Sequence, residues 1–310
     1  MNTVFIFNPA AGKGKTVEKL KREILQVATE TDVQVELYDT KAKGDGASFV
    51  REYCRKNGTA RFIACGGDGT FSEVVNGVAD FPGSQAGVFP MGTGNDFCRN
   101  FTREHNFKNI KALLLGETVK CDLIKYSSEE SKGYCANMVN IGFDCNVADL
   151  TGRLKKRKFI GGSFAYFLSI LIMLIKKKGA KLRIIADGKE LQNGKLLLHS
   201  VANGSFCGGG IKSNPDAELQ DGEMDINIVY NISRVNFLSK LPFYMKGTHR
   251  KLKNIEKAIY SQKCKKLEVT PLKGKMRICV DGDVMETGET VFEIVPQAFE
   301  FVLPKKDEII

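Results

Sequence analysis

The sequence lacks tryptophan and contains only three histidines in 310 residues. The histidines show no metal-ligand spacing and are interpreted as structural. The nine cysteines form no CxxC pair and their number is odd, which argues against a disulfide framework or a zinc site and favours buried thiols in a reducing compartment. The N-terminus lacks a signal-peptide pattern, so a cytoplasmic protein is expected.

A long hydrophobic run is also missing. The uncharged stretch Phe159 to Ile175 holds 17 residues, fewer than the roughly 20 that a membrane span needs. We expect a buried or groove-lining helix over Phe159 to Lys178. An interfacial amphipathic helix and a true span are the less favoured alternatives.

Charge of one sign dominates two stretches. The net charge is +10, residues Leu150 to Ala186 carry ten Lys or Arg and no acid, and Glu256 is the only acid between Lys246 and Lys266. Such stretches suit a nucleotide, an anionic membrane or a nucleic acid, although a solvated basic face is the alternative. Nucleic acid is disfavoured because the basic residues lack interleaved aromatic residues and tryptophan is absent.

The length and the 43% hydrophobic content predict two domains. The first hundred residues alternate short β-rich runs with helical patterns, which predicts a parallel sheet covered by helices. The expected strands are Thr3–Phe7, Val33–Tyr38, Arg61–Ala64 and Gly87–Phe89, and the expected helices are Thr16–Ala28, a helix through Ala47 and Cys54, and Phe71–Val78. From about Cys121 onward, β-rich segments joined by Gly, Asn and Asp turns predict a mainly antiparallel domain, with a helix at Phe237–Met245.

Glycine-rich loops follow three of the predicted strands. The strongest is CGGDGTFSEVVNGV, from Cys65 to Val78, whose glycines let the backbone approach an anion ahead of a helix N-terminus. Asp68 would repel a bare phosphate, so its presence favours a bridging Mg²⁺. The alternative is an ordinary glycine turn with an Asx cap. FNPAAGKGK and PMGTGNDF occupy equivalent positions, whereas a Walker A motif and an NAD-type GxGxxG with its acid are absent.

These three loops, together with NIGFDCNVA, VANGSFCGGGIKSNPDAELQDGEMDINIV and VDGDVMETGE, resemble the diacylglycerol kinase catalytic domain family, whose members include soluble bacterial lipid kinases and the sphingosine and ceramide kinases. The resemblance covers nearly the whole chain. It implies that residues 1–121 form a nucleotide-binding α/β domain similar to that of NAD kinases and phosphofructokinases. The C-terminal residues 297–310 can return to this domain. It also implies a β-sandwich-like lipid-substrate domain in 122–296, with the active site in the cleft between the two.

The resemblance also implies roles for individual residues. The catalytic set would be Asp68 and Asp96 near the catalytic Mg²⁺ and a base in the second domain. The ATP site would comprise Asn8, Pro9, Ala10, Ala11, Gly12, Thr40, Gly67, Asp68, Gly69, Thr70, Phe71, Ser72, Glu73 and Thr93.

The base is the point where this sequence departs from the family. The family's DGE motif is Asp281, Gly282 and Asp283 here, so Asp283 is the expected base although its side chain is one methylene shorter than glutamate. Nearby Glu286 is a candidate to compensate. The alternative is a simple hairpin turn, for which Asp-Gly is a common signal.

A second, structural Mg²⁺ is implied at AELQDGEMD. The backbone carbonyls of Glu218 and Glu223 and the side chain of Asp221 would hold it, and Mg²⁺ accepts such a site because it keeps several waters.

The resulting expectation is a lipid kinase that transfers the γ-phosphate of ATP to the hydroxyl of diacylglycerol or a similar lipid, bound peripherally to an anionic membrane surface on its inner face. The sequence allows a homodimer without requiring one. An enzyme similar to NAD kinases and a non-catalytic lipid or nucleotide sensor are the alternatives, the second because the DGD departure would weaken the base.

Overall fold

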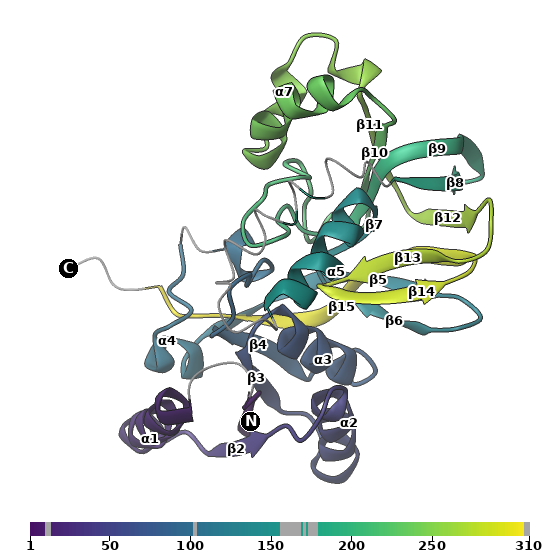
Figure 1. Ribbon diagram of the computed structural model, residues 1–310. Coiled ribbons are helices and arrows are strands. Elements are labelled where there is room, and N and C mark those ends of the chain that lie inside the picture. The colour runs from purple at the N-terminus through teal and green to yellow at the C-terminus, as the bar shows by residue number, and fades with distance from the viewer. Residues whose placement is uncertain (10–13, 102–103, 156–168, 170–171, 173–178, 307–310) are drawn as a thin grey trace. The chain divides into compact units, whose positions relative to one another are not determined.

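The computed structural model describes residues 1–9, 14–101, 104–155, 169, 172 and 179–306 (Figure 1). The chain divides into two compact units. The first unit comprises Met1–Leu123 and Pro296–Ile310, and the second comprises Ile124–Val295. Strands β5 and β15 contribute residues to both units.

The first unit alternates strands with helices along the chain. Its elements are β1 (Thr3–Phe7), α1 (Gly14–Thr31), β2 (Val35–Asp39), α2 (Asp45–Asn57), β3 (Arg61–Gly66), α3 (Asp68–Val78), β4 (Gln85–Pro90), the 3-10 turn η1 (Cys98–Asn100), α4 (Ile110–Leu114), the start of β5 (Glu117–Ser127) and the end of β15 (Thr290–Leu303).

These strands form a parallel sheet in the order β2-β1-β3-β4-β15, which confirms the predicted parallel α/β arrangement. All five side chains of β1 are buried, as expected for a strand covered on both faces. Helix α3 begins at Asp68, three residues before the predicted start. An acidic residue in the first turn is favourable there because it faces the positive end of the helix dipole.

The second unit is built mainly of strands. Its elements are the end of β5, β6 (Lys132–Cys135), β7 (Met138–Gly142), α5 (Phe143–Lys155), β8 (Ala180–Ala186), β9 (Lys189–Ala202), β10 (Met224–Tyr230), α7 (Arg234–Met245), the 3-10 turns η2 (His249–Lys251) and η3 (Ile255–Lys257), β11 (Ile259–Cys264), β12 (Lys266–Pro271), β13 (Met276–Val280), β14 (Asp283–Thr287) and the start of β15.

The strand pairs in the second unit are antiparallel, as predicted. They run in the order β14-β13-β7-β9-β8-β12-β15, and β10 pairs with β9 and β11. Alternate side chains such as Leu182, Ile184 and Ala186 of β8 point into one core, where they meet Phe292 and Val201. Helix α7 was predicted over Phe237–Met245 and begins earlier, at Arg234, where the Ser233 hydroxyl caps it by accepting the Asn236 N–H.

Most of the predicted helix Phe159–Lys178 lies outside the described residues. Among the helices that the structure describes, none combines the length and apolar character that crossing a membrane requires. All nine cysteines are free thiols, eight of them buried.

Candidate active site

Polar residues that follow β1 and β2 meet α3 at one edge of the first unit's sheet. The Asn8 N–H donates to the Cys65 carbonyl at 3.3 Å, and the Thr40 N–H donates to the Phe7 carbonyl at 2.8 Å. The Asn8 amide also donates to the Thr70 hydroxyl at 3.4 Å. Parallel strands end at the same edge, which is where ligands bind in such sheets. Asn8, Thr40 and Thr70, all predicted from the sequence, therefore lie around one location.

Glycines allow the loops after β3 and β4 to touch. The Gly92 N–H donates to the Gly66 carbonyl at 3.1 Å. A Cβ added to Gly92 would lie 2.5 Å from Gly67 Cα, and one added to Gly66 would collide with the Thr70 side chain. Real Cβ atoms do not approach so closely, so a side chain at position 92 would push the two loops apart and one at position 66 would displace the Thr70 side chain.

Asp68 ties the loop after β4 to the start of α3. Its carboxylate accepts the Asn95 N–H at 2.8 Å and the Asp96 N–H at 2.6 Å. Asn95 adopts a left-handed conformation with φ 53°, which turns both N–H groups toward the carboxylate. Each carboxylate oxygen has a second lone pair, so Asp68 can hold this loop and still bind a cation.

Asp68 and Asp96 also fit a magnesium ion. A Cβ on Gly94 would collide with Asp68 Oδ2 and lie 3.5 Å from Asp96 Oδ2, so both carboxylates border one location. Asp96 is 7% exposed, and Arg99 Nε lies 3.5 Å from its Oδ1. Two close carboxylates repel unless a cation joins them. In the part of the chain that the structure describes, no group of three His, Cys, Asp or Glu side chains could hold a metal. Water and phosphate oxygens would complete the coordination of Mg²⁺.

Glu73 fixes the start of α2. Its two oxygens accept the N–H groups of Gly44 and Gly46 at 2.8 and 2.9 Å. Gly44 takes φ 84°, a conformation that favours glycine. The carboxylate also faces the positive end of the helix dipole, so Glu73 holds α2 against α3.

The remaining predicted ATP-site residues differ in what they offer a ligand. Phe71 is 4% exposed and packs 4.8 Å from Phe97 and 5.6 Å from Phe301, so only its backbone is available. Pro9, Gly69 and Thr93 are exposed, and Ser72 is half-buried. Ala10, Ala11 and Gly12 lie outside the described residues.

The DGD segment forms a two-residue hairpin turn in the second unit. Val280 pairs with Asp283, the first residue of β14, while Asp281 and Gly282 turn the chain with φ 45° and 94°. Positive φ at both positions is the geometry that Asp-Gly favours. The hairpin alternative is therefore correct for the backbone, and it is compatible with a chemical role for Asp283, which is half-buried.

Asp281 anchors this turn. Its carboxylate accepts the N–H groups of Ala136, Asn137 and Met138 at 2.8 to 3.1 Å, and the Cys135 thiol lies 3.1 Å away. Burial raises the pKa of Asp281, while the thiol and the backbone N–H groups act in the opposite direction. The position of Asp283 is consequently fixed by its neighbour. The sequence signal for Asp281 was the Asp-Gly pair itself, which indicated only a turn.

Glu286 is poorly placed to assist Asp283. Side chains alternate between the faces of a strand, so Glu286, three residues along β14, lies on the opposite face from Asp283. It pairs across the ladder with Arg277 and is exposed.

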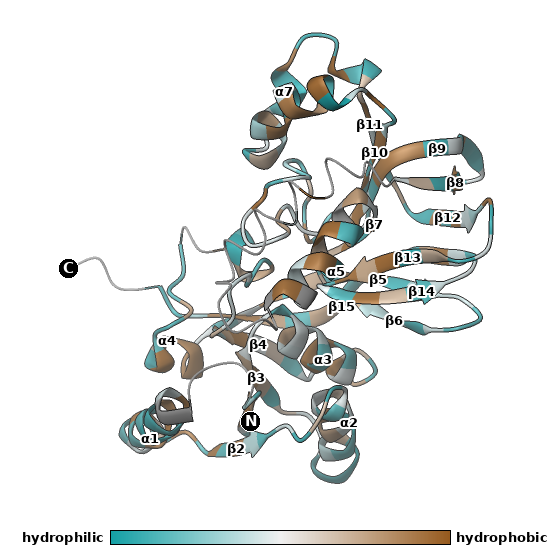
Figure 2. Ribbon diagram, in the orientation of Figure 1, coloured by the Kyte–Doolittle hydropathy of each residue, from teal (hydrophilic) through white to brown (hydrophobic). Residues whose placement is uncertain are grey.

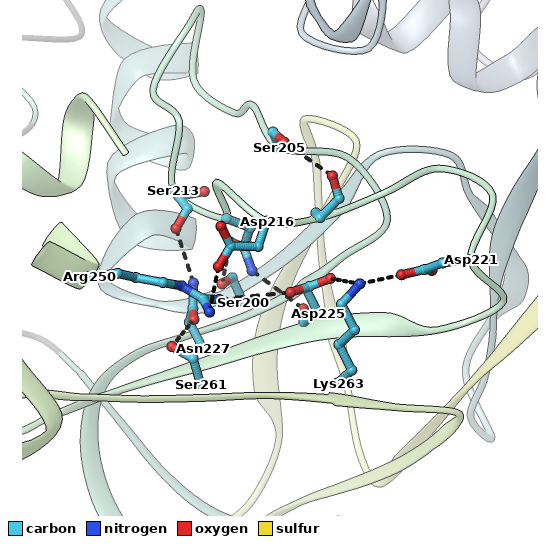
Figure 3. Close-up of polar contacts among 12 residues, drawn as sticks. Ser200, Ser205, Ser213, Asp216, Asp221, Asp225, Asn227, Arg250, Ser261 and Lys263 are labelled. Carbon is cyan, nitrogen blue, oxygen red and sulfur yellow. Dashed lines mark hydrogen bonds and ion pairs between the residues drawn. The ribbon is translucent and has the colours of Figure 1, made fainter. Parts of the chain in front are cut away.

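The predicted structural metal site contains a lysine. The Lys263 ammonium forms an ion pair with Asp221 and lies 3.7 Å from Asp225 Oδ2 (Figure 3). Arg250 lies 3.8 Å from Asp225 Oδ1, and burial raises the pKa of Asp225 to about 6. The other oxygen of Asp221 accepts the Glu223 N–H at 3.0 Å. Asp221 is the only side-chain ligand in the predicted set, because Glu218 and Glu223 would contribute backbone carbonyls. Lys263 neutralises the Asp221 carboxylate, so these residues do not fit a second Mg²⁺ in this arrangement. No sequence motif had pointed to Lys263.

Two family models and several curated relatives match this chain. Residues 2–126 match the model of the diacylglycerol kinase catalytic domain, and residues 137–303 match that of the YegS C-terminal NAD kinase beta sandwich-like domain. A diacylglycerol kinase of Staphylococcus carnosus is 30% identical over 97% of this chain and 94% of its own length. One of Bacillus subtilis is 28% identical over 97% and 96%.

Solved structures share the fold. A diacylglycerol kinase from Bacillus anthracis str. Sterne superimposes with a TM-score of 0.67 at 21% identity, covering 97% of this chain and 96% of the other. Another structure from the same organism reaches 0.73 at 23% identity, with the same coverage. These matches confirm the predicted α/β domain followed by a β-sandwich-like domain, and the chain belongs to the diacylglycerol kinase family.

Proposed function

We propose that this protein is an ATP-dependent diacylglycerol kinase, with an ATP site in the first unit and a lipid site in the second. The observation that carries this proposal is the convergence of glycine loops on two carboxylates, Asp68 and Asp96, at one sheet edge. Glycines let the two loops pack beside the first turn of α3, whose N–H groups favour an anion such as a triphosphate. Membership of the family supports the choice of diacylglycerol as acceptor.

Phosphoryl transfer needs alignment and charge neutralisation more than covalent help from the protein. Asp68 and Asp96 would hold Mg²⁺, which when bound offsets the negative charge of the phosphates. The acceptor hydroxyl forms a bond to the γ-phosphorus as the bond to the β,γ-bridging oxygen breaks, and ADP leaves. Asp283 takes the hydroxyl proton. The products are phosphatidic acid and ADP.

Asp283 suits the role of base for two reasons. It begins β14 on the face opposite Glu286, and Asp281 anchors the turn before it by accepting three backbone N–H groups. General base catalysis contributes about 10² to 10⁴ in rate when the base lies within hydrogen-bond reach of the proton. Because aspartate is one methylene shorter than the family's glutamate, the distance between the Asp283 carboxylate and the acceptor hydroxyl decides whether Asp283 can act as the base.

The experiment is transfer of radiolabelled γ-phosphate from ATP to diacylglycerol, sphingosine, phosphatidylglycerol and undecaprenol in mixed micelles with Mg²⁺. We expect label in diacylglycerol, complete loss with Asp68→Ala, and a loss of at least about 100-fold with Asp283→Asn. Glu286→Gln, on the same strand but the opposite face, is the matched control and should retain activity. ATP binding should survive Asp283→Asn, because Asp283 lies in the second unit.

A non-catalytic sensor is the second candidate, and aspartate in place of glutamate at position 283 is the observation that favours it. Tight ATP binding without transfer to any acceptor, unchanged by Asp283→Glu, would replace the kinase proposal with the sensor. With NAD added to the same assay as a further acceptor, transfer to NAD alone would replace diacylglycerol as the acceptor. A kinase acting on diacylglycerol works where ATP meets a bilayer, the cytoplasmic face of a membrane.

A further inference from the structure

Helix α7 of the second unit exposes an unusual number of apolar side chains. Val235 is 78% exposed, Leu238 49%, Phe243 42% and Met245 38%. Among the described residues only eight large hydrophobic side chains are exposed, and these four belong to one helix of 12 residues. Figure 2 shows apolar and polar residues side by side on α7. An exposed apolar cluster of this kind marks a surface that contacts something other than water.

The two faces of α7 are distinct. Phe237 and Tyr244 are buried and, with Leu241, pack against the core formed by α5, β9 and β10. Val235, Leu238, Pro242 and Met245 follow at intervals of three and four residues and form the other face. The exposed apolar residues are therefore not needed to attach the helix to the protein.

Basic residues are frequent in α7 and in the segment that follows it directly. Residues 234–257 contain seven Lys or Arg and one acid, Glu256. Arg250 is paired with Asp216 at 2.6 Å. Lys246, Lys251, Lys253 and Lys257 are exposed. An exposed apolar row on a helix that is followed at once by exposed lysines suits a helix that lies in the plane of an anionic lipid surface.

We propose that the docking face, defined as α7 with the exposed lysines of 246–257, binds the anionic surface of a lipid bilayer. Val235, Leu238 and Met245 enter the boundary between head groups and acyl chains, and the lysines contact the lipid phosphates. The inference deepens the proposed function, because a kinase whose acceptor is a membrane lipid must reach that membrane.

The charge argues for a lipid surface over a second copy of the chain. A two-fold interface on this face would bring the same lysines of both copies together, and their repulsion would oppose association. Nucleic acid fits less well, because three of the four exposed apolar side chains are aliphatic and offer no ring for stacking on bases.

The test measures binding of the full-length protein to vesicles without ATP or diacylglycerol. Vesicles of phosphatidylcholine with about one-third phosphatidylglycerol are compared with pure phosphatidylcholine, and bound protein is measured by flotation. Each lysine near an anionic surface contributes about fivefold to partitioning, so the triple change Lys246→Gln, Lys251→Gln and Lys253→Gln should lower binding by about 100-fold. The matched control is the same change at the exposed lysines 132, 189 and 195, which should have a much smaller effect.

The apolar contribution is tested separately. Val235→Ser with Leu238→Ser should lower partitioning by at least about tenfold, because each methylene withdrawn from the acyl boundary costs about fourfold. Leu25→Ser on α1 is the control, since Leu25 is 47% exposed, close to the 49% of Leu238.

Failure of this inference is distinguishable from failure of the proposed function. Phosphorylation of a short-chain diacylglycerol dissolved as monomers requires no bilayer, and both sets of docking-face variants should retain it. Vesicle binding equal to wild type in these variants would overturn the docking face, whatever the kinase assay gives. A change from dimer to monomer with unaltered vesicle binding would overturn it in favour of self-association.

Discussion

Replacing Asp68 with asparagine separates its structural contribution from its role toward a metal ion. The carboxylate accepts two backbone N–H groups, from Asn95 and Asp96, at 2.8 and 2.6 Å. Bonds of this charge-assisted kind contribute about 1.5–3 kcal/mol each. Asparagine keeps one as a neutral bond of about 1 kcal/mol and turns an amide N–H toward the other donor. Relief of repulsion with Asp96 offsets part of the loss, so we expect the free energy of unfolding to fall by about 2 kcal/mol.

The assay is thermal unfolding followed by circular dichroism, first in EDTA and then with Mg²⁺ and ATP. A loss of about 2 kcal/mol lowers Tm by about 4–8 °C in a protein region of this size. Asp80→Asn is the control. Asp80 is exposed and its carboxylate lies 3.9 Å from Arg51 Nε, and a surface ion pair this long contributes at most about 0.5 kcal/mol to stability. Mg²⁺ and ATP should raise the Tm of wild type more than that of Asp68→Asn, since a ligand that binds the folded state more tightly stabilises it more at the same concentration.

The result that would refute this reasoning is specific. If Asp68→Asn melts with wild type in EDTA, the two backbone hydrogen bonds contribute nothing and Asp68 acts only toward the ligand. If its Tm is lower than that of wild type in EDTA but rises by as much as wild type with Mg²⁺ and ATP, the metal role of Asp68 is wrong. The structural role of its two backbone hydrogen bonds is then confirmed.

Three further predictions concern stability. Gly92→Ala should lower Tm because its Cβ would lie 2.5 Å from Gly67 Cα, whereas Gly69→Ala, with nothing within 4 Å, should fold normally; equal melting temperatures would contradict this. Asp281→Ala leaves three backbone N–H groups without their acceptor and should cost at least about 3 kcal/mol by urea unfolding, with a loss under 1 kcal/mol as the contrary result. Burial lowers the pKa of His199 from 6.5 to about 4. The unfolded chain then binds the extra proton, so stability falls as pH drops from 6.5 toward 4, by about 3 kcal/mol in total. His199→Gln should remove that share of the pH dependence, and an unchanged profile would refute it.

The elements of the first unit could be predicted from sequence because their signals are local. Thr3–Phe7 is a continuous apolar run and matches β1. In α1 the apolar residues Val17, Leu20 and Ile24 recur at helical spacing and are buried. The start of α3 was missed by three residues because Asp68 read as part of a glycine loop, while its backbone already takes helical geometry.

The roles of the candidate acids remain predictions, drawn from the family resemblance and from glycines that lie next to carboxylates after strands. The acids themselves were visible in the sequence. Their partners were not. Asp68 binds N–H groups 27 and 28 residues away, and Asp281 binds N–H groups more than 140 residues away. Backbone N–H groups are the same in every residue, so no sequence pattern marks which of them a carboxylate will meet.

The sequence by itself determined the parallel and antiparallel halves, the Asp-Gly hairpin and the identity of the candidate acids, because period, turn chemistry and residue type act over a few positions. Tertiary structure decided that Lys263 meets Asp221, that Phe71 joins the core, that Glu286 lies across the strand from Asp283, and that α7 leaves four apolar side chains in water. Those outcomes depend on packing between segments distant along the chain, and packing is settled only when the whole core forms.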